Sequence, residues 1–212
     1  MKPALIFDLD GTLWDSSGVV AESWNEVGRR YYGDSYFVSS EEVRGLMGKT
    51  MVEIANYLLP ENAGSEAERF TQECFSYEIT YLGPHPGSLF PNELEILKKL
   101  ACDYRLFIVS NCQNGYIENF LPLVPAGLFE GFMCFGDTHK PKNVTIRALM
   151  KKFGIEKAAY IGDTSGDEKA TRLAEIPFIH ASYGYGTCEN PDASAESFED
   201  LLIKCPQVLP IL

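Results

Sequence analysis

Short runs of apolar residues, each ending in polar or turn-forming residues, alternate along this chain with segments of helical periodicity. The first run is Ala4–Phe7, and similar runs occupy residues 106–109, 131–135, 158–161 and 177–180. A short apolar run that ends abruptly is typical of a strand buried on both faces of a parallel sheet. Amphipathic segments follow at residues 91–100, 116–121, 144–153, 167–174 and 195–204. This alternation predicts an α/β fold, a doubly wound parallel sheet of five strands with helices between them.

Residues 16–82 interrupt this alternation with a long stretch of helical character. Apolar and aromatic residues recur there at three- and four-residue spacing: Val20, Trp24, Val27 and Tyr31, then Phe70, Cys74, Tyr77 and Tyr81. The segment Ser39-Ser40-Glu41-Glu42 is typical of a helix start. A crossover between parallel strands commonly needs one helix, not three or four. We therefore expect an inserted helical cap at residues 16–82, an α/β core at 1–15 and 83–212, and a stiff Gly/Pro hinge at 83–87.

Composition and charge narrow the classes of partner. The chain is 45% hydrophobic and 23% charged, which excludes wholesale disorder. A formal net charge of −12 argues against nucleic acid or an anionic membrane surface as partner. An anionic small molecule would need a metal ion or a few local cations at its site. We expect a small-molecule partner, no nucleic acid and no membrane, and leave the oligomeric state open.

Cysteine usage indicates a reducing compartment. The six cysteines are scattered without paired short spacing, so free thiols of a cytoplasmic protein explain them better than disulfides or zinc ligands. The first expected strand begins too early to leave room for a signal peptide. No apolar run approaches the roughly 20 residues that span a bilayer. We expect a cytoplasmic protein.

Polar residues follow three of the expected strands directly. Asp8 and Asp10 follow the first, Ser110 and Asn111 the second, and Asp163 the fourth, with Asp167 close behind. The carboxyl ends of parallel strands share one edge of the sheet, where ligands of open α/β sheets bind. Two carboxylates one residue apart repel each other, so we expect a cation between them. The sequence predicts a site at this edge.

Four motifs in this order resemble the haloacid dehalogenase-like hydrolase superfamily. They are DLDGT at residues 8–12, Ser110-Asn111, a lysine within Lys140-Pro141-Lys142, and GDTSGD at 162–167. The resemblance covers essentially the whole chain, and the segment VRGLMG at 43–48 is similar to a cap segment of phosphoglycolate-phosphatase-type members. It implies a helical cap and a Mg²⁺-dependent phosphatase that hydrolyses a small phosphorylated metabolite through a covalent aspartyl-phosphate. The physiological substrate stays open.

The resemblance also implies roles for the residues at the sheet edge. Asp8 would be the nucleophile, and Asp10 the general acid and base. Mg²⁺ would be held by Asp8, Asp163 and the main-chain carbonyl of Asp10, in keeping with its preference for oxygen ligands. Asp167 would hold the loop or the lysine rather than bind the metal directly.

Phosphate would be bound by hydroxyl, amide and ammonium groups: Thr12, Ser110, Asn111, and either Lys140 or Lys142. Both lysines fit a family pattern, and spacing does not decide between them, although the neighbouring residues slightly favour Lys142. In the cap, Arg44, Gly48 and Lys49 form a plausible loop facing the site and selecting the substrate.

Two other functions use the same chemistry. A phosphohexose mutase, like beta-phosphoglucomutase, would pass the aspartyl-phosphate to a sugar instead of water. A receiver-like domain would accumulate phosphate on its aspartate, but its acceptor is expected on a later strand and it has no helical insert. A dehalogenase is disfavoured because cleaving a carbon–halogen bond needs no acid for the leaving group, yet Asp10 is present.

Overall fold

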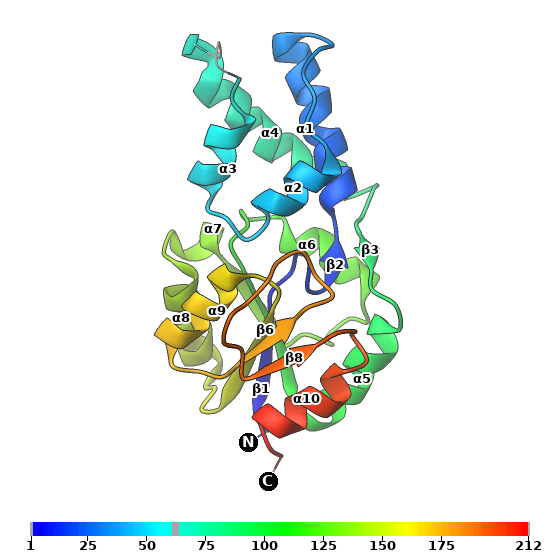
Figure 1. Cartoon of the computed structure of the whole chain (residues 1–212), viewed down its shortest axis with the longest axis vertical. Helices are drawn as coiled ribbons and strands as arrows, with labels where there is room; N and C mark the ends of the chain where they lie inside the picture. Colours follow the sequence, from blue (N-terminus) through cyan, green and yellow to red (C-terminus); the bar gives the residue numbers. More distant parts are fainter. Residues whose placement is uncertain (1, 61–63, 212) are drawn as a thin grey trace.

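A six-stranded parallel sheet forms the centre of the lower part of the molecule in the computed structural model, which describes residues 2–60 and 64–211 (Figure 1). In spatial order its strands are β5 (Gly131–Cys134), β4 (Arg105–Ser110), β1 (Ala4–Phe7), β6 (Ala158–Gly162), β7 (Phe178–Ala181) and β8 (Ala193–Ala195). The first strand, β1, lies between β4 and β6 and is fully buried. The predicted α/β fold with a parallel sheet is confirmed.

The carboxyl-terminal part of the chain differs from the prediction. The helix expected at residues 195–204 begins later, as α10 (Leu201–Val208), and the sixth strand β8 pairs with β7 before it. Between them the Asp200 carboxylate accepts hydrogen bonds from the backbone N–H groups of Glu196 and Ser197, which holds this stretch as a turn. The edge strand was missed because its small residues carry little β-propensity.

Helices cover both faces of the sheet. On one face α8 (Lys142–Phe153) and α9 (Ser165–Ala174) bury apolar side chains such as Ile146 and Ala170 against the strands. On the other face α5 (Glu93–Asp103) and α10 do the same with Leu97 and Leu201. Short helices complete the connections: α6 (Ile117–Phe120), the 3-10 turn η2 (Leu121–Leu123) and α7 (Phe135–Thr138).

Residues 17–60 and 64–82 form a group of helices beyond the carboxyl edge of the sheet, which we call the helical segment (Figure 1). Its elements are α1 (Ser17–Tyr32), α2 (Ser40–Leu46), α3 (Met51–Leu58), the 3-10 turn η1 (Gly64–Glu66) and α4 (Ala67–Leu82). The helix start predicted near Ser39 is confirmed: its side chain and that of Glu42 each accept a hydrogen bond from the other's backbone N–H, a reciprocal cap that stabilises α2. Across residues 2–60 and 64–211, no helix combines the length and apolarity that crossing a bilayer requires.

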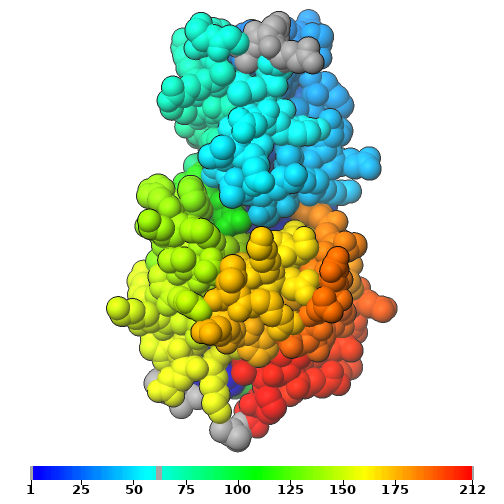
Figure 2. All heavy atoms as spheres, turned by 60° about the vertical axis from the view of Figure 1, so that its left-hand side comes forward, coloured from blue at the N-terminus to red at the C-terminus, as the bar shows by residue number. Residues whose placement is uncertain are grey.

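Two short strands join the helical segment to the sheet. The chain enters the segment through β2 (Trp14–Asp15) and leaves it toward β3 (Ser88–Leu89), and these strands pair antiparallel, Trp14 opposite Leu89. Gly87 fits closely here, because a Cβ at this position would lie 2.9 Å from the carbonyl oxygen of Asp15. In the space-filling view, cyan atoms of the segment meet the yellow and orange surface below them (Figure 2). The division of the chain into cap and core domains stays a prediction.

Candidate active site

Three neighbouring strands end at one point on the sheet edge and carry polar side chains there. Asp8 follows β1, Ser110 ends β4 and Asp163 follows β6, and all three side chains are buried. The Asp8 N–H donates to the carbonyl of Ile161 at 2.8 Å, which joins the end of β1 to the end of β6. Parallel pairing of the three strands therefore brings these predicted residues together.

Lys142 lies between two of the carboxylates. It begins α8, and its ammonium nitrogen lies 2.9 Å from Asp8 Oδ1 and 2.5 Å from Asp167 Oδ1. Its side chain is only 5% exposed, whereas Lys140, two residues earlier, is exposed. Of the two lysines that the sequence left open, the structure brings Lys142 into the cluster. We call Asp8, Asp10, Asp163, Lys142 and Asp167 the strand-end cluster.

Burial dominates the electrostatics of this cluster. Desolvation raises the pKa of Asp8 well above its ordinary value, and the Lys142 ammonium opposes that shift. Desolvation, with the nearby charge of Asp167, raises the pKa of Asp163 to about 7. The two neighbouring carboxylates hold the pKa of Lys142 well above its usual range despite burial. One lysine thus faces more negative charge than it neutralises.

Asp10 is held by three donors on one oxygen. Its Oδ1 accepts hydrogen bonds from Trp14 Nε1 at 2.9 Å, Ser16 Oγ at 2.6 Å and Tyr116 OH at 2.9 Å. Its Oδ2 accepts none from the described residues. Burial raises the pKa of Asp10, and these hydrogen bonds oppose the rise. In the neutral acid the proton therefore resides on Oδ2, the oxygen that none of the three donors occupies.

Asp163 is fixed by the loops around it. The Tyr185 N–H donates to its Oδ2 at 2.8 Å, and the Thr12 hydroxyl lies 3.4 Å from its Oδ1. Gly11 has a φ of +77°, and a Cβ there would lie 2.8 Å from the Tyr185 ring as well as overlapping the Asp163 carboxylate. Glycine is required at residue 11 because the backbone must take this left-handed turn directly beside the carboxylate.

The residues predicted to bind phosphate lie around the cluster with different partners. Thr12 is fully buried, with its hydroxyl toward Asp163. Ser110 Oγ lies 3.4 Å from the Cys112 N–H, and the Asn111 side-chain amide donates to the Gly48 carbonyl at 2.9 Å. That last bond joins the sheet edge to the helical segment. The phosphate-binding role of all of these residues stays a prediction.

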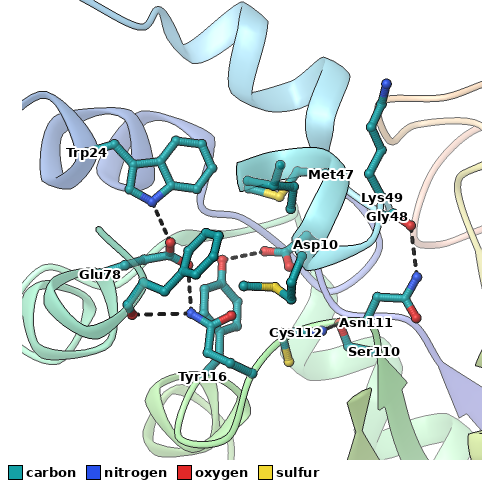
Figure 3. A pocket seen from close by; sticks show the side chains of 14 residues that line it. Asp10, Trp24, Met47, Gly48, Lys49, Glu78, Ser110, Asn111, Cys112 and Tyr116 are labelled. Carbon is teal, nitrogen blue, oxygen red and sulfur yellow. Dashed lines mark hydrogen bonds between the residues drawn. The ribbon is translucent and has the colours of Figure 1, made fainter. Parts of the chain in front are cut away.

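Of the three residues predicted to select substrate, Gly48 and Lys49 line the cavity described below and Arg44 lies elsewhere. Lys49 is exposed, its side chain extending away from the cavity (Figure 3). Arg44 contacts Asp15 at 2.9 Å and donates from Nε to Ser17 Oγ at 3.1 Å, next to the β2–β3 connection. Their role in selectivity stays a prediction.

The carboxylates fit a divalent cation. Oxygen atoms of Asp8, Asp163 and Asp167 lie within 4.8 Å of one another, and all three residues are buried. Both Asp167 oxygens are already engaged, Oδ1 by Lys142 and Oδ2 by the N–H and hydroxyl of Thr164. Asp8 Oδ2 accepts no hydrogen bond from the described residues. The uncompensated negative charge and the oxygen donors suit Mg²⁺ at Asp8 and Asp163.

A cavity lies between the strand-end cluster and the helical segment. In Figure 3, Trp24 and Met47 lie above it and Ser110 and Tyr116 below it, while Glu78 and Asp10 face it from opposite sides. Its volume is about 40 Å³ for the centre of a water-sized molecule. It can therefore hold only a small group in this arrangement.

Several of these residues were not predicted. Trp14, Ser16 and Tyr116 around Asp10 carry no motif, and Tyr116 is 106 positions away in sequence. Glu78 had a signal that was overlooked: with Phe70, Cys74 and Leu82 it repeats every four residues along the buried face of α4. A carboxyl in such a stripe indicates a polar site.

Comparisons with known proteins agree with this geometry. The sequence model of the haloacid dehalogenase-like hydrolase family matches residues 5–181. The chain is 30% identical over 216 residues to the phosphoglycolate phosphatase of Photorhabdus laumondii subsp. laumondii, across 94% of this chain and 90% of that protein. It is 28% identical over 200 residues to that of Rhodobacter capsulatus, across 87% and 86%. The crystal structure of a predicted phosphoglycolate phosphatase from Haemophilus somnus 129pt, 24% identical, matches the fold with a TM-score of 0.81 across 96% and 97% of the two chains.

Proposed function

The chain belongs to the haloacid dehalogenase-like hydrolase family and is a phosphatase, and from this premise we propose that it hydrolyses a small phosphorylated metabolite in two steps through a phosphoryl group carried on Asp8. The observation that carries the proposal is that two carboxyl groups each have one oxygen without a hydrogen-bond donor among the described residues. Asp8 Oδ2 is without a hydrogen bond from the described residues, and Asp10 Oδ2 is equally unoccupied at the cavity wall. One carboxyl can attack while the other moves a proton.

In the first step, Asp8 attacks phosphorus, and the bond from phosphorus to the alcohol oxygen breaks. Asp10 gives its Oδ2 proton to that departing oxygen, so the alcohol leaves neutral. In the second step, Asp10 takes a proton from water as the water attacks the same phosphorus. The bond from Asp8 to phosphorus breaks, and inorganic phosphate leaves. A carboxylate nucleophile divides one difficult displacement into two easier ones.

Asp8, Asp163 and the main-chain carbonyl of Asp10 are the groups that would hold Mg²⁺. When bound, the ion would offset the repulsion between the substrate phosphate and the carboxylates. The Lys142 ammonium, 2.9 Å from Asp8 Oδ1, opposes the rise in the pKa of Asp8 and so favours its ionised form. Asp167 holds that ammonium in place from the other side. Ser110, Asn111 and Thr12 would supply neutral donors for the phosphate oxygens.

We also infer a reducing, cytoplasmic location. All six cysteines are free thiols, and four of them are buried. Buried unpaired thiols are common in compartments that keep cysteine reduced.

Release of phosphate from a generic aryl phosphate tests the proposed function. We expect hydrolysis that requires Mg²⁺, stops when a chelator removes the ion and returns when Mg²⁺ is added back. A phosphoprotein that accumulates with acetyl phosphate and does not turn over would instead indicate a receiver-like acceptor. Equal activity with and without chelator would contradict the role of the metal.

A further inference from the structure

Glu78 occupies the end of the cavity that faces away from the sheet. It lies on α4 and is 4% exposed. Its Oε2 accepts a hydrogen bond from Trp24 Nε1 at 2.6 Å, while Oε1 has only a long contact, 3.4 Å, from the Gln113 side-chain amide (Figure 3). Oε1 therefore retains capacity for a hydrogen bond to a group inside the cavity.

Positive charge is scarce where the alcohol part of a substrate would lie. Of the described residues that line the cavity, Lys49 alone is cationic, and its side chain is exposed and extends away. Lys142 is engaged by Asp8 and Asp167, and Arg44 by Asp15. Apart from the carboxyls of Asp10 and Glu78, the other lining groups are apolar side chains and neutral polar groups. A carboxylate brought here would lose its hydration without gaining a counter-charge, which is unfavourable.

The ionisation of Glu78 adds to this preference for a neutral group over a carboxylate in the cavity. Burial raises its pKa to about 8, the nearby Asp10 carboxylate adds to the rise, and the Trp24 hydrogen bond opposes it. Near neutral pH the carboxyl is largely protonated and can donate from Oε1 to a neutral oxygen. At higher pH it becomes an anion, which repels any second anion.

We propose that Glu78 makes this phosphatase selective for phosphomonoesters of small alcohols carrying an uncharged hydrogen-bonding group, such as a hydroxyl or amide, and against alcohols carrying a carboxylate. The inference rests on the proposed function and deepens it. It separates this chain from the phosphoglycolate phosphatases it resembles, since phosphoglycolate is a phosphate ester that carries a carboxylate. The small cavity volume restricts the alcohol to a few non-hydrogen atoms.

Two probes of the same shape isolate the charge: phosphoglycolate and its neutral amide, glycolamide phosphate. We expect the wild-type protein with Mg²⁺ to hydrolyse the amide with a kcat/KM at least about tenfold higher. A kcat/KM for phosphoglycolate equal to or above that of the amide would overturn the inference. Failure of the proposed function would show separately, as no phosphate release from an aryl phosphate.

Glu78→Gln tests whether this residue is responsible. Between pH 7 and pH 9 we expect the wild-type preference for the amide to rise about fivefold or more, because Glu78 ionises in this interval. The ratio should stay constant with pH in Glu78→Gln, because glutamine does not titrate. A ratio that rises equally in both proteins would overturn the assignment to Glu78.

The surroundings make that ratio a clean readout. The other titratable groups facing Glu78 are Asp10, Tyr116, Cys74 and Cys112. An ionised Asp10 would also disfavour the carboxylate probe, but it is present in both wild type and Glu78→Gln, so its contribution cancels when the two proteins are compared. Burial raises the pKa values of the phenol and both thiols well above pH 9. Glu68→Gln, an exposed change on the same helix, is the matched control and should behave as wild type. Thermal unfolding of Glu78→Gln checks that the variant folds. If it does not fold, the ratio of kcat/KM values for the two probes in the wild-type protein still tests the inference.

Discussion

Two ion pairs of equal length divide this molecule into two kinds of region. Lys142 and Asp8 are 2.9 Å apart with side chains 5% and 3% exposed, whereas Arg44 and Asp15 are 2.9 Å apart with 48% and 32% exposed. The first pair belongs to the strand-end cluster, and the second lies next to the β2–β3 connection that joins the helical segment to the sheet. Burial makes the first pair costly to disturb, while solvent screens the second. The proposed chemistry lies in the buried region, and the solvent-exposed β2–β3 connection is the region where we expect substitutions to be tolerated.

The largest effect should come from Asp8→Asn. An amide keeps the shape but has no carboxylate to attack phosphorus, so we expect phosphate release to fall by at least about 10⁴-fold. Steady-state assays with aryl phosphate and Mg²⁺ measure the loss, and circular dichroism checks the fold. Activity within tenfold of wild type would show that Asp8 is not the nucleophile. The buried cluster would then matter no more to activity than the exposed Arg44–Asp15 pair.

Asp10→Asn should follow, with a loss of about 10²–10⁴-fold on alkyl phosphates. The asparagine oxygen can still accept from Trp14, Ser16 and Tyr116, so the geometry survives while the transferable proton is lost. Aryl phosphates should suffer less, because their leaving groups need little protonation. Equal losses on both substrate types would show that Asp10 is not the acid.

Lys142→Ala and Lys140→Ala compare a buried with an exposed lysine directly. We expect the first to lose activity about 100-fold and to lower the free energy of unfolding by about 3 kcal/mol, because Asp8 and Asp167 lose their counter-charge. The exposed lysine should matter only a few-fold and change stability by less than about 0.5 kcal/mol. Chemical denaturation and kinetics on both variants measure these losses. A larger loss in Lys140→Ala than in Lys142→Ala would assign the phosphate-binding role to Lys140.

Mg²⁺ affinity should depend on pH through Asp163. Its pKa is raised to about 7, so below that value protons compete with the cation, and binding strengthens as pH rises through it. For one competing proton with this pKa we expect the affinity to change by about tenfold per pH unit well below pH 7, by about fivefold between pH 6 and pH 7, and then to level off. Calorimetric titration of Mg²⁺ measures this, and Asp163→Asn should weaken binding at every pH. Affinity that is flat between pH 5 and pH 8 would argue against Asp163 as a ligand.

Arg44→Ala should have the smallest effect. The pair with Asp15 is solvent-exposed, so we expect a change in stability below about 1 kcal/mol. If Arg44 selects substrate, the ranking of natural phosphomonoesters should shift while aryl phosphate hydrolysis stays within about twofold. A uniform loss on every substrate would indicate that Arg44 only stabilises the β2–β3 connection. Kinetics on a substrate panel separate the two.

Sequence patterns predicted most of the sheet because its strands are short, apolar and abruptly ended. Five of the six strands correspond to such runs, and β8 escaped because Ala193–Ala195 contains no branched or aromatic residue. The pairing of β2 with β3 was equally invisible. Two-residue strands have no measurable periodicity, and their partner is decided by where the helical segment returns.

Most of the strand-end cluster could be predicted from sequence because its members lie within a few residues of a strand end or a helix start. Position along the chain then dictates position in space. Glu78, Trp24 and Tyr116 depend instead on how α1, α4 and α6 pack, which is set by side-chain fit. The choice between Lys140 and Lys142 was of the same kind. Lys142 begins α8 and Lys140 precedes it, and this difference of two residues decides whether the ammonium lies 2.9 Å from Asp8 or in solvent.

The paired strands β2 and β3 have a consequence for how such an enzyme diversifies. Because Trp14 lies opposite Leu89, the helical segment leaves and rejoins the sheet at adjacent points, as a surface loop does. A loop whose ends are already together can be lengthened, shortened or exchanged with little effect on the rest of the fold. Under the proposed mechanism, substrate preference can therefore change by remodelling or transplanting these helices, while the strand-end cluster is inherited unchanged.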